Sequence, residues 1–322
     1  MAQLVSLIIP CFNEEDALNM LYKELCAVSG SMTEKYGVGF EFLLINDGSR
    51  DRTLPILRGL AEKDERVRYI SFSRNFGKEA SIYAGLQNCT GEYIAILDAD
   101  MQDPPSMLPQ MYEGIVNEKY DRVVAQRVTR KGEPIMRSFF ARCFYKIINN
   151  MSKTKITDGA RDFSMMTRQV AEAILTMPEY NRFYKGIYSW VGFETKLISY
   201  ENVERSAGKT KWSFGKLFFY ALDGILSFST APLIIASVSG IILCLGALVY
   251  ICIVVIKTLL YGDPVAGFPT LICVISLIGG FQLFCMGILG QYLAKTYMEV
   301  KKRPIYLIKE SKLNDKIWSP QV

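Results

Sequence analysis

The sequence predicts an α/β fold with a largely parallel sheet, followed by two membrane-spanning helices. Over the first 127 residues, short apolar runs typical of strands alternate with helical patterns, which favours parallel strands joined by helices. Two stretches without a charged residue follow, at 231–256 and 268–294, and each is long enough to cross a bilayer. The chain is therefore expected to combine an α/β domain with a membrane hairpin.

The elements of the α/β domain follow from hydrophobic periodicity and from turn residues. The predicted strands are residues 5–10, 40–47, 67–73, 92–100 and 121–127. The predicted helices are residues 13–29, a charged segment after the second strand, 78–88 and 106–118. Asn13 is the expected N-cap of the first helix, with Asp16 three residues further on.

Two later segments, 134–151 and 211–228, have amphipathic helical patterns. In the first, Arg137, Arg142 and Lys146 lie between apolar pairs rich in aromatic residues. One interpretation is an ordinary surface helix that packs on the sheet, and the other is a helix that lies in the membrane interface. The aromatic stripe and the spans that follow favour the interface.

The charges around the two apolar stretches predict their orientation. The connecting segment carries Asp263 and one lysine, Lys257, whereas four basic residues follow the second span, namely Lys295, Lys301, Lys302 and Arg303. By the positive-inside rule the loop faces outward, and the N-terminal domain and the tail face the cytosol. The alternative is a buried hairpin in a soluble core. The predicted divisions are 1–133, 134–230, 231–295 for the hairpin and 296–322 for a cytoplasmic tail.

Composition excludes several classes of protein. The chain has no histidine, which argues against zinc catalysis and against a Ser-His-Asp triad. Its eight cysteines form no CxxC pair, and the N-terminus lacks the basic region of a cleavable signal peptide. The net charge is +5, with lysine and arginine concentrated between Arg122 and Arg161. Because that basic stretch is interleaved with a membrane-type stripe, an anionic membrane surface is favoured and nucleic acid is not expected.

An acidic cluster is the main candidate for a site. The run "ILDADMQDPP" places Asp98, Asp100 and Asp103 at the end of a strand, where ligands of parallel sheets bind. Carboxylates this close repel unless a cation lies among them, and an Asp-x-Asp pair suits a hard divalent cation. A turn with helix-capping acids is the alternative, and it explains Asp103 but not Asp98 and Asp100.

Several common motifs that bind calcium, phosphate or dinucleotides are absent from the sequence. The spacing excludes an EF-hand, since Asp103 stands at the sixth position of the loop and Pro109 at the twelfth. No Walker A loop occurs, and the segment 37–42 precedes a strand, so it is not a dinucleotide fingerprint. Mg²⁺ or Mn²⁺ held by one or two carboxylates usually takes its other ligands from substrate phosphates, so a metal-diphosphate is the expected partner.

The motifs taken together resemble the family 2 glycosyltransferases, whose GT-A fold is a Rossmann-like, mostly parallel sheet. These motifs are "IIPCFNEE", "INDGSRDRT", "SRNFGKEASIYAGL" and "LDADMQDPP". The later segments "TDGARDFSMM" and "WVGFETKLISYENVERSAGKTKW", with the two spans, resemble the polyprenyl-phosphate glycosyltransferases. That group includes relatives of dolichyl-phosphate mannose synthase and the bacterial undecaprenyl-phosphate glucosyltransferases.

The resemblance implies a role for each matching position. Pro10, Phe12 and Glu14 would line the nucleotide pocket, and Ile45 and Asp47 would contact the base. Asp98, Ala99 and Asp100 would bind the ribose and the metal-diphosphate, with Gln102 as a further metal ligand beside Asp98 and Asp100. Phosphates would be held by Arg127, Arg205 and Lys211. The residues implied to be catalytic are Asp162, Asp100 and Arg205. The family often has arginine where this chain has Ser164, and Arg161 or Arg168 could replace it.

The implied activity is inverting transfer of a sugar from a UDP-sugar to polyprenyl (undecaprenyl) phosphate at the cytosolic face of the bacterial inner membrane. Residues 1–133 would bind the nucleotide sugar and 134–230 the acceptor. Glucose or an N-acetylhexosamine is the expected sugar, its lipid-linked form would supply cell-envelope glycosylation, and relatives suggest a homotetramer. The rivals are a processive polysaccharide synthase, disfavoured because Gln-x-x-Arg-Trp is missing, and a non-catalytic membrane scaffold.

Overall fold

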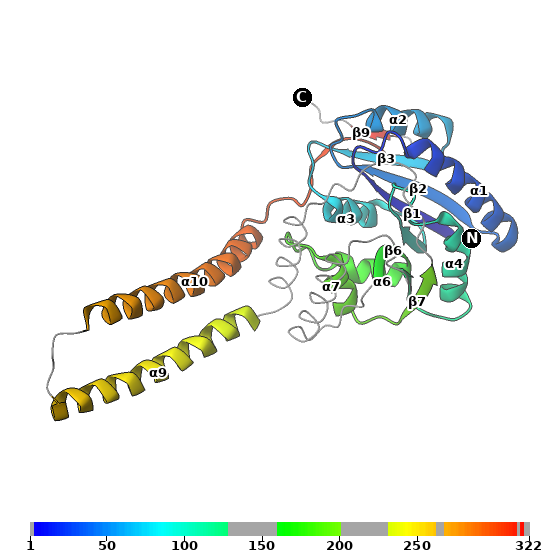
Figure 1. The fold of residues 1–322 in the computed structure, drawn as a ribbon. Helices are drawn as coiled ribbons and strands as arrows, with labels where there is room; N and C mark the ends of the chain where they lie inside the picture. Colours follow the sequence, from blue (N-terminus) through cyan, green and yellow to red (C-terminus); the bar gives the residue numbers. More distant parts are fainter. Residues whose placement is uncertain (1–2, 128–159, 201–230, 262–266, 314–315, 319–322) are drawn as a thin grey trace.

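A computed structural model describes residues 3–127, 160–200, 231–261, 267–313 and 316–318. The described strands form one sheet of nine in the order β7-β5-β6-β4-β1-β2-β3-β8-β9 (Figure 1). The strands are β1 Leu4–Cys11, β2 Gly39–Asn46, β3 Val67–Phe72, β4 Tyr93–Ile96, β5 Arg122–Arg127, β6 Ala160–Thr167, β7 Thr195–Tyr200, β8 Ile308–Leu313 and β9 Lys316–Trp318. The helices are α1 Leu18–Tyr36, α2 Thr53–Lys63, α3 Lys78–Asn88, α4 Leu108–Val116, α6 Arg168–Leu175, α7 Tyr184–Trp190, α9 Ala231–Tyr261 and α10 Phe268–Val300, with a 3₁₀ turn η1 at Pro105–Met107.

The centre of the sheet is parallel, as the alternation of elements predicts. β1 pairs in parallel with β2 and β4, β2 pairs in parallel with β3, and β5 with β7. Antiparallel pairings flank this centre, with β6 between β4 and β5 and with β8 beside β3. The predicted α/β class with two apolar C-terminal helices is confirmed.

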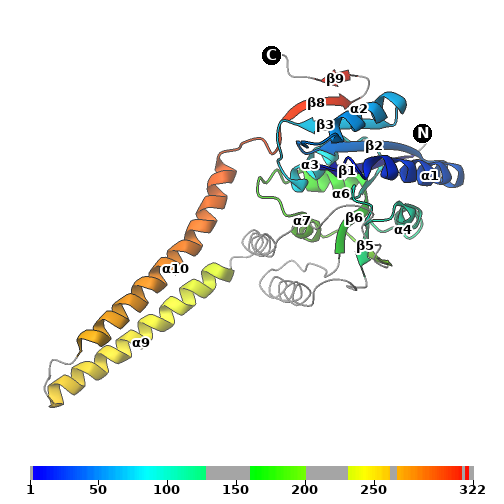
Figure 2. The same cartoon turned by 45° about the horizontal axis from the view of Figure 1, so that its top comes forward.

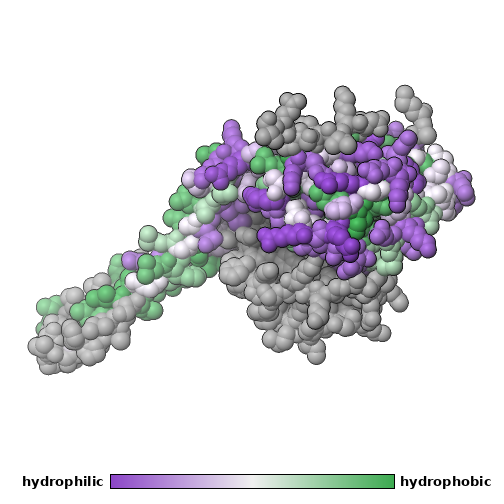
Figure 3. All heavy atoms as spheres, turned by 90° about the horizontal axis from the view of Figure 1, so that it is seen from above, coloured by the Kyte–Doolittle hydropathy of each residue, from purple (hydrophilic) through white to green (hydrophobic). Residues whose placement is uncertain are grey.

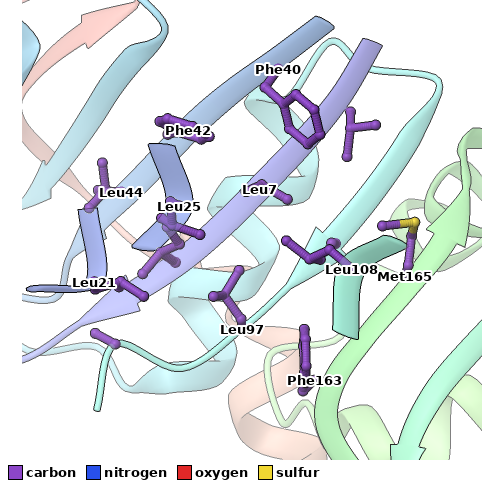
Figure 4. Close-up of a cluster of buried hydrophobic side chains, with 14 of the residues drawn as sticks. Leu7, Leu21, Leu25, Phe40, Phe42, Leu44, Leu97, Leu108, Phe163 and Met165 are labelled. Atoms are coloured by element: carbon purple, nitrogen blue, oxygen red, sulfur yellow. The ribbon is translucent and has the colours of Figure 1, made fainter. Parts of the chain in front are cut away.

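Apolar side chains fill both faces of the sheet. Successive residues of a strand point to opposite faces, so Leu7 and Ile9 join one cluster and Ile8 joins the other. The first cluster packs under α1, α2 and α4 and includes Leu21, Phe42 and the other side chains of Figure 4. The second cluster packs under α3, α6 and α7. A sheet covered on both faces leaves its strand ends as the accessible edge for a site.

Two element boundaries differ from the prediction. α1 begins at Leu18 rather than at residue 13, and Ala17 is its N-cap. Asn13 is not the cap because it has a left-handed backbone (φ 54°) and its side chain bonds to the next loop. β4 ends at Ile96, so Asp98 and Asp100 lie in the loop that leaves the sheet rather than on the strand.

The segment after α10 returns to the sheet. Within residues 296–322, β8 pairs antiparallel with β3, and β9 pairs with β8. Glu310 on β8 accepts a hydrogen bond from Arg58 Nε on α2 at 2.8 Å, and a second from its Nη2. The C-terminal end of the hairpin is therefore connected to the α/β domain through β8.

α9 and α10 run side by side as a hairpin that projects away from the α/β domain (Figures 1 and 2). The stretches Pro232–Tyr250 and Leu277–Val300 are long and apolar enough to cross a membrane, and neither window is buried within the chain. Hydrophobic colour marks the described part of the hairpin, whereas the described surface of the α/β domain is mostly hydrophilic (Figure 3). Within the described residues the hairpin is therefore not packed inside the core of the α/β domain. The predicted amphipathic helices at 134–151 and 211–228 lie outside the described residues.

Candidate active site

The candidate site lies where β1, β2 and β4 end. β6 runs antiparallel to β4, so its first residues reach the same edge, and Ser164 of β6 pairs with Ile96 at the end of β4. Asp162 therefore stands two residues nearer the start of β6, beside the loop that carries Asp98. α3 begins nearby with Lys78 and supplies a third element.

Hydrogen bonds join the loop after β1 to the loop after β2. The amide of Asn13 donates to Ser49 Oγ, and the amide of Arg50 donates back to Asn13 Oδ1, both at 2.9 Å. The amide of Glu14 donates to Thr53 Oγ1 at 2.9 Å. These bonds stabilise the left-handed backbone of Asn13, which a non-glycine residue rarely adopts. The segment that carries Phe12 and Glu14 is thus fixed relative to the loop after β2.

Asp47 orders the segment that leads into α3. Its buried carboxylate accepts hydrogen bonds from the amides of Phe76 (2.6 Å) and Gly77 (2.9 Å) and from Asn75 Nδ2 (2.9 Å). Burial raises the pKa of Asp47 to about 6, although these amides act in the opposite direction. Asp47 thereby sets the position of Lys78, the first residue of α3.

Lys78 bridges two carboxylates, that of Asp98 in the loop after β4 and that of Asp162 on β6. Its Nζ lies 2.6 Å from Asp98 Oδ1 and 2.5 Å from Asp162 Oδ2. Burial alone would lower the pKa of Lys78, but Asp162 and Asp98 outweigh burial and raise that pKa well above its usual value. Burial would likewise raise the pKa of Asp162, but Lys78, followed by Lys185, holds it well below its usual range. Asp162 is therefore an ionised carboxylate at neutral pH.

A second positively charged side chain, that of Arg161, contacts the loop that carries Asp98, Asp100 and Asp103 (the acidic loop). Arg161 Nε donates to Asp103 Oδ1 at 3.4 Å, and Tyr200 OH donates to the same oxygen at 2.8 Å. Burial, then Asp98, raises the pKa of Asp103 to about 6, against the effect of Arg161. Asp103 is 1% exposed, so its carboxylate supports the loop from inside.

The oxygens of the acidic loop suit a hard divalent cation. Asp100 Oδ1 accepts the amide of Gln102 at 3.1 Å, and Arg161 Nη2 donates to Gln102 Oε1 at 3.2 Å. Met101 between them has a left-handed backbone (φ 61°), a strain that is typical of functional sites. Among the described residues no group of three or more His, Cys, Asp or Glu side chains is arranged to hold a metal. Two carboxylates with an amide oxygen nevertheless fit Mg²⁺ or Mn²⁺, which complete their shell with water or phosphate oxygens.

The other predicted site residues divide by burial. Pro10 and Glu14 are partly exposed and Phe12 is 38% exposed, so their side chains are accessible at the end of β1. Ile45 and Ala99 are buried, Ile45 fully, so only their backbone could contact a ligand. Arg127 ends β5, although its side chain lies outside the described residues, as do Arg205 and Lys211.

The position of Ser164 has a neighbouring arginine. Arg122 Nη2 on β5 donates to Ser164 Oγ at 3.3 Å, and the Arg122 guanidinium lies 3.5 Å from the centre of the Tyr188 ring. Burial lowers the pKa of Arg122 to about 10. Of the two arginines considered from the sequence, Arg161 lies at the site, whereas Arg168 donates to the carbonyl of Gly91 at the opposite end of β4. The sequence did not predict Arg122 as the arginine that contacts Ser164.

Sequence reasoning also missed Lys78 and its neighbour Glu79. A lysine in the first turn of a helix opposes the helix dipole, which is the signal that could have pointed to carboxylate partners. Burial, then Asp162, raises the pKa of Glu79 to about 8, and Glu79 Oε2 accepts the amide of Tyr184 at 3.3 Å. The site thus combines hard oxygen ligands, a bridging ammonium and an ionised Asp162, which suits binding of a metal-diphosphate beside a second substrate.

Comparison with known proteins gives a family match to the first half of the chain and relatives that cover nearly all of it. The family model described as Glycosyl transferase family 2 matches residues 6–175. CsbB of Bacillus subtilis, assigned to the glycosyltransferases, is 42% identical over 97% of this chain and 93% of its own length. The prophage bactoprenol glucosyl transferase homolog of Escherichia coli is 41% identical over 96% of this chain and 99% of its own. The bactoprenol glucosyl transferase of Shigella phage SfII is 40% identical over 95% and 98%.

Proposed function

The chain belongs to glycosyl transferase family 2, and from that premise we propose that it transfers a sugar from a UDP-sugar to polyprenyl phosphate. The supporting observation is that relatives named for bactoprenol glucosyl transfer match at 40–41% identity over 95–96% of this chain, hairpin included. Undecaprenyl phosphate is the acceptor that those names favour, and glucose is favoured over an N-acetylhexosamine as the sugar. The product would be a lipid-linked sugar for cell-envelope glycosylation.

The donor would bind at the ends of β1, β2 and β4. Pro10, Phe12 and Glu14 would line the nucleotide pocket, with the backbone of Ile45 and the loop ordered by Asp47 near the base. Asp98, Asp100 and Gln102 would hold Mg²⁺ or Mn²⁺, and the bound ion would supply positive charge to the departing UDP. Arg127, Arg205 and Lys211 would add fixed positive charge at the phosphates.

Asp162 would act on the acceptor side. The second pKa of a phosphate monoester is about 6, so the acceptor is largely a dianion at neutral pH and needs little deprotonation. An ionised Asp162 paired with Lys78 is suited to orienting the acceptor or the sugar rather than to removing a proton. A single displacement by the acceptor phosphate oxygen at the anomeric carbon, with UDP leaving, would invert that centre.

The hairpin would anchor the enzyme where its acceptor resides. A polyprenyl chain leaves the bilayer only at a large free-energy cost, so the active site must work at the interface. α9 and α10 would cross the cytoplasmic membrane, with the α/β domain and the C-terminal segment in the cytosol. The segments 134–151 and 211–228 would lie in the interface, and a homotetramer remains a prediction.

A transfer assay tests this function. Full-length protein in detergent receives undecaprenyl phosphate, Mg²⁺ or Mn²⁺, and a panel of radiolabelled UDP-sugars. We expect label in the organic phase that is lost with EDTA and with Asp100→Ala, and retained with Glu62→Ala, an exposed acid on α2. Label in a water-soluble polymer instead would indicate a polysaccharide synthase. Absence of transfer from every donor, despite metal-dependent UDP binding, would reject the UDP-sugar proposal. GDP-sugars would then be tested as donors, and a second failure would favour the non-catalytic membrane scaffold.

A further inference from the structure

We propose that Lys78 is an exchangeable counter-cation of the donor site. Its ammonium holds Asp98 while the site contains no divalent cation, and it releases Asp98 when a divalent cation enters together with a nucleoside diphosphate. Lys78 would thus make the binding of cation and diphosphate cooperative. This inference rests on the proposed function, which assigns Asp98 to the cation, and it concerns a residue to which that proposal gives no role in donor binding.

The Lys78 ammonium contacts the Asp98 oxygen that a divalent cation would need as a ligand. Lys78 Nζ lies 2.6 Å from Asp98 Oδ1, within direct hydrogen-bonding distance. A divalent cation on that oxygen would lie within a few ångströms of the ammonium, and like charges this close repel. The Asp98 carboxylate therefore cannot keep the ammonium and accept a divalent cation at that oxygen at the same time.

The backbone beneath Lys78 is held, whereas its side chain can move. Asp47 accepts the amides of Phe76 and Gly77 immediately before α3, and Glu79 accepts the amide of Tyr184 immediately after Lys78. The Lys78 side chain is 37% exposed and has a flexible four-carbon stem with three donors. An exchange of partners thus needs only rotation of the side chain, with no movement of α3.

The Lys78 ammonium already has a second partner, the Asp162 carboxylate. Asp162 Oδ2 lies 2.5 Å from Nζ and would keep one contact during the exchange. A cation alone would displace Lys78 from Asp98 and leave two positive groups close together. A cation that enters with a diphosphate brings phosphate oxygens that can accept the displaced donors. The arrangement therefore disfavours the bare cation and favours the cation-diphosphate pair.

The inference is tested by Mn²⁺ binding, followed through the electron paramagnetic resonance signal of unbound Mn²⁺, with and without UDP. For the wild type we expect UDP to tighten Mn²⁺ binding by about tenfold or more, within the usual range of coupling between sites. For Lys78→Met we expect bare Mn²⁺ to bind about tenfold tighter and the effect of UDP to shrink below about threefold. Lys78→Gln should behave as Lys78→Met, and Lys78→Arg, which keeps the charge, as the wild type.

The control for net charge is Lys35→Met, which removes an exposed ammonium from a surface pair with Glu113. This variant should leave the Kd for Mn²⁺ unchanged, both with and without UDP. Asp98→Asn should abolish tight Mn²⁺ binding in the Lys78→Met background. Unchanged bare-Mn²⁺ affinity in both Lys78→Met and Lys78→Gln, or tightening that Lys35→Met reproduces, would overturn the inference. No sugar or lipid is present, so a protein that transfers no sugar but shows the tightening rejects the proposed function alone.

Discussion

Glu299, in the last turn of α10, accepts two hydrogen bonds from Asn181, one from its backbone amide and one from its side-chain Nδ2, both at 2.9 Å. The same carboxylate accepts the amide of Tyr180 at 3.0 Å. The loop that receives these bonds leads directly into α7, which carries Lys185 near Asp162. The end of the apolar hairpin is thus joined to the loop before α7, on the side of the candidate site where Asp162 lies.

Glu299→Gln should loosen this joint, because the amide side chain has one carbonyl oxygen in place of two charged acceptors. We expect the amides of Tyr180 and Asn181 to exchange about tenfold faster, which corresponds to about 1.4 kcal/mol of local opening free energy. Hydrogen-exchange mass spectrometry of peptides covering residues 177–184 measures this. Glu113→Gln, the same change at the exposed pair with Lys35, is the control. Equal exchange in both variants would mean that Glu299 does not hold the loop.

Asp162→Asn should lower kcat by about 100-fold or more and leave the Kd for UDP measured without a divalent cation unchanged, because Asp162 is proposed to act on the acceptor rather than on the nucleotide. Lys78 keeps the pKa of Asp162 below the working range, so this group should not produce the acid limb of the pH-rate profile. The limb should rise through about pH 6, with the second ionisation of the acceptor phosphate. It should persist in Asp162→Asn and in Asp103→Asn, measured with saturating donor. Disappearance of the limb in Asp162→Asn would make Asp162 the general base.

Glu79 should make the fold less stable as pH rises. Burial, then Asp162, raises its pKa from 4.5 to about 8, so the folded state keeps this proton over a range in which the unfolded chain has lost it. Stability from this group is therefore full below the unfolded pKa and falls between about pH 4.5 and pH 8, by up to about 1.4 kcal/mol per pH unit.

The corresponding measurement is denaturant unfolding of wild type and Glu79→Gln across pH 4 to 9, followed by tryptophan fluorescence. Glutamine resembles the protonated side chain, so the variant should gain stability relative to wild type as pH rises and reach a plateau above about pH 8. Glu65→Gln, at an exposed position, should show no such trend. A difference that is independent of pH would contradict the prediction.

Gly48→Ala should destabilise the fold and weaken donor binding. Gly48 has a φ of 65°, and an added Cβ would lie 2.4 Å from the backbone carbon of Arg74 and 2.6 Å from the amide nitrogen of Asn75. The backbone there cannot yield without moving the segment that Asp47 holds, so we expect a loss of about 2 kcal/mol or more.

Gly30→Ala is the matched control, because Gly30 is helical and a Cβ there meets nothing within 4 Å. This substitution should stabilise the protein by about 0.5–1 kcal/mol. Thermal unfolding with and without UDP and Mn²⁺ separates the two effects. A Gly48→Ala protein as stable as wild type would show that the 74–75 segment can move aside.

Local patterns were sufficient for much of this protein. Alternation of apolar runs with helical patterns predicted β1 to β5 and the helices between them, since side-chain periodicity is a property of neighbouring residues. The two uncharged stretches predicted α9 and α10, and the charge repulsion within 98–103 predicted a cation-binding edge. The same reasoning misplaced the start of α1, because the Asn13 side chain bonds across to Arg50 and does not cap its own helix.

The tertiary structure decided what depends on residues distant in the sequence. Insertion of β6 antiparallel between β4 and β5 brings Asp162 opposite Asp98, and α3 then directs Lys78 between them. Return of β8 to the edge of β3 and the joint of Glu299 with Asn181 are of the same kind. Strand order and register arise from burial of whole faces and from long-range pairing, which no local periodicity encodes. The sequence by itself determined most elements of residues 1–127, the two apolar helices and the acidic edge, and only the fold decided which cation balances that edge.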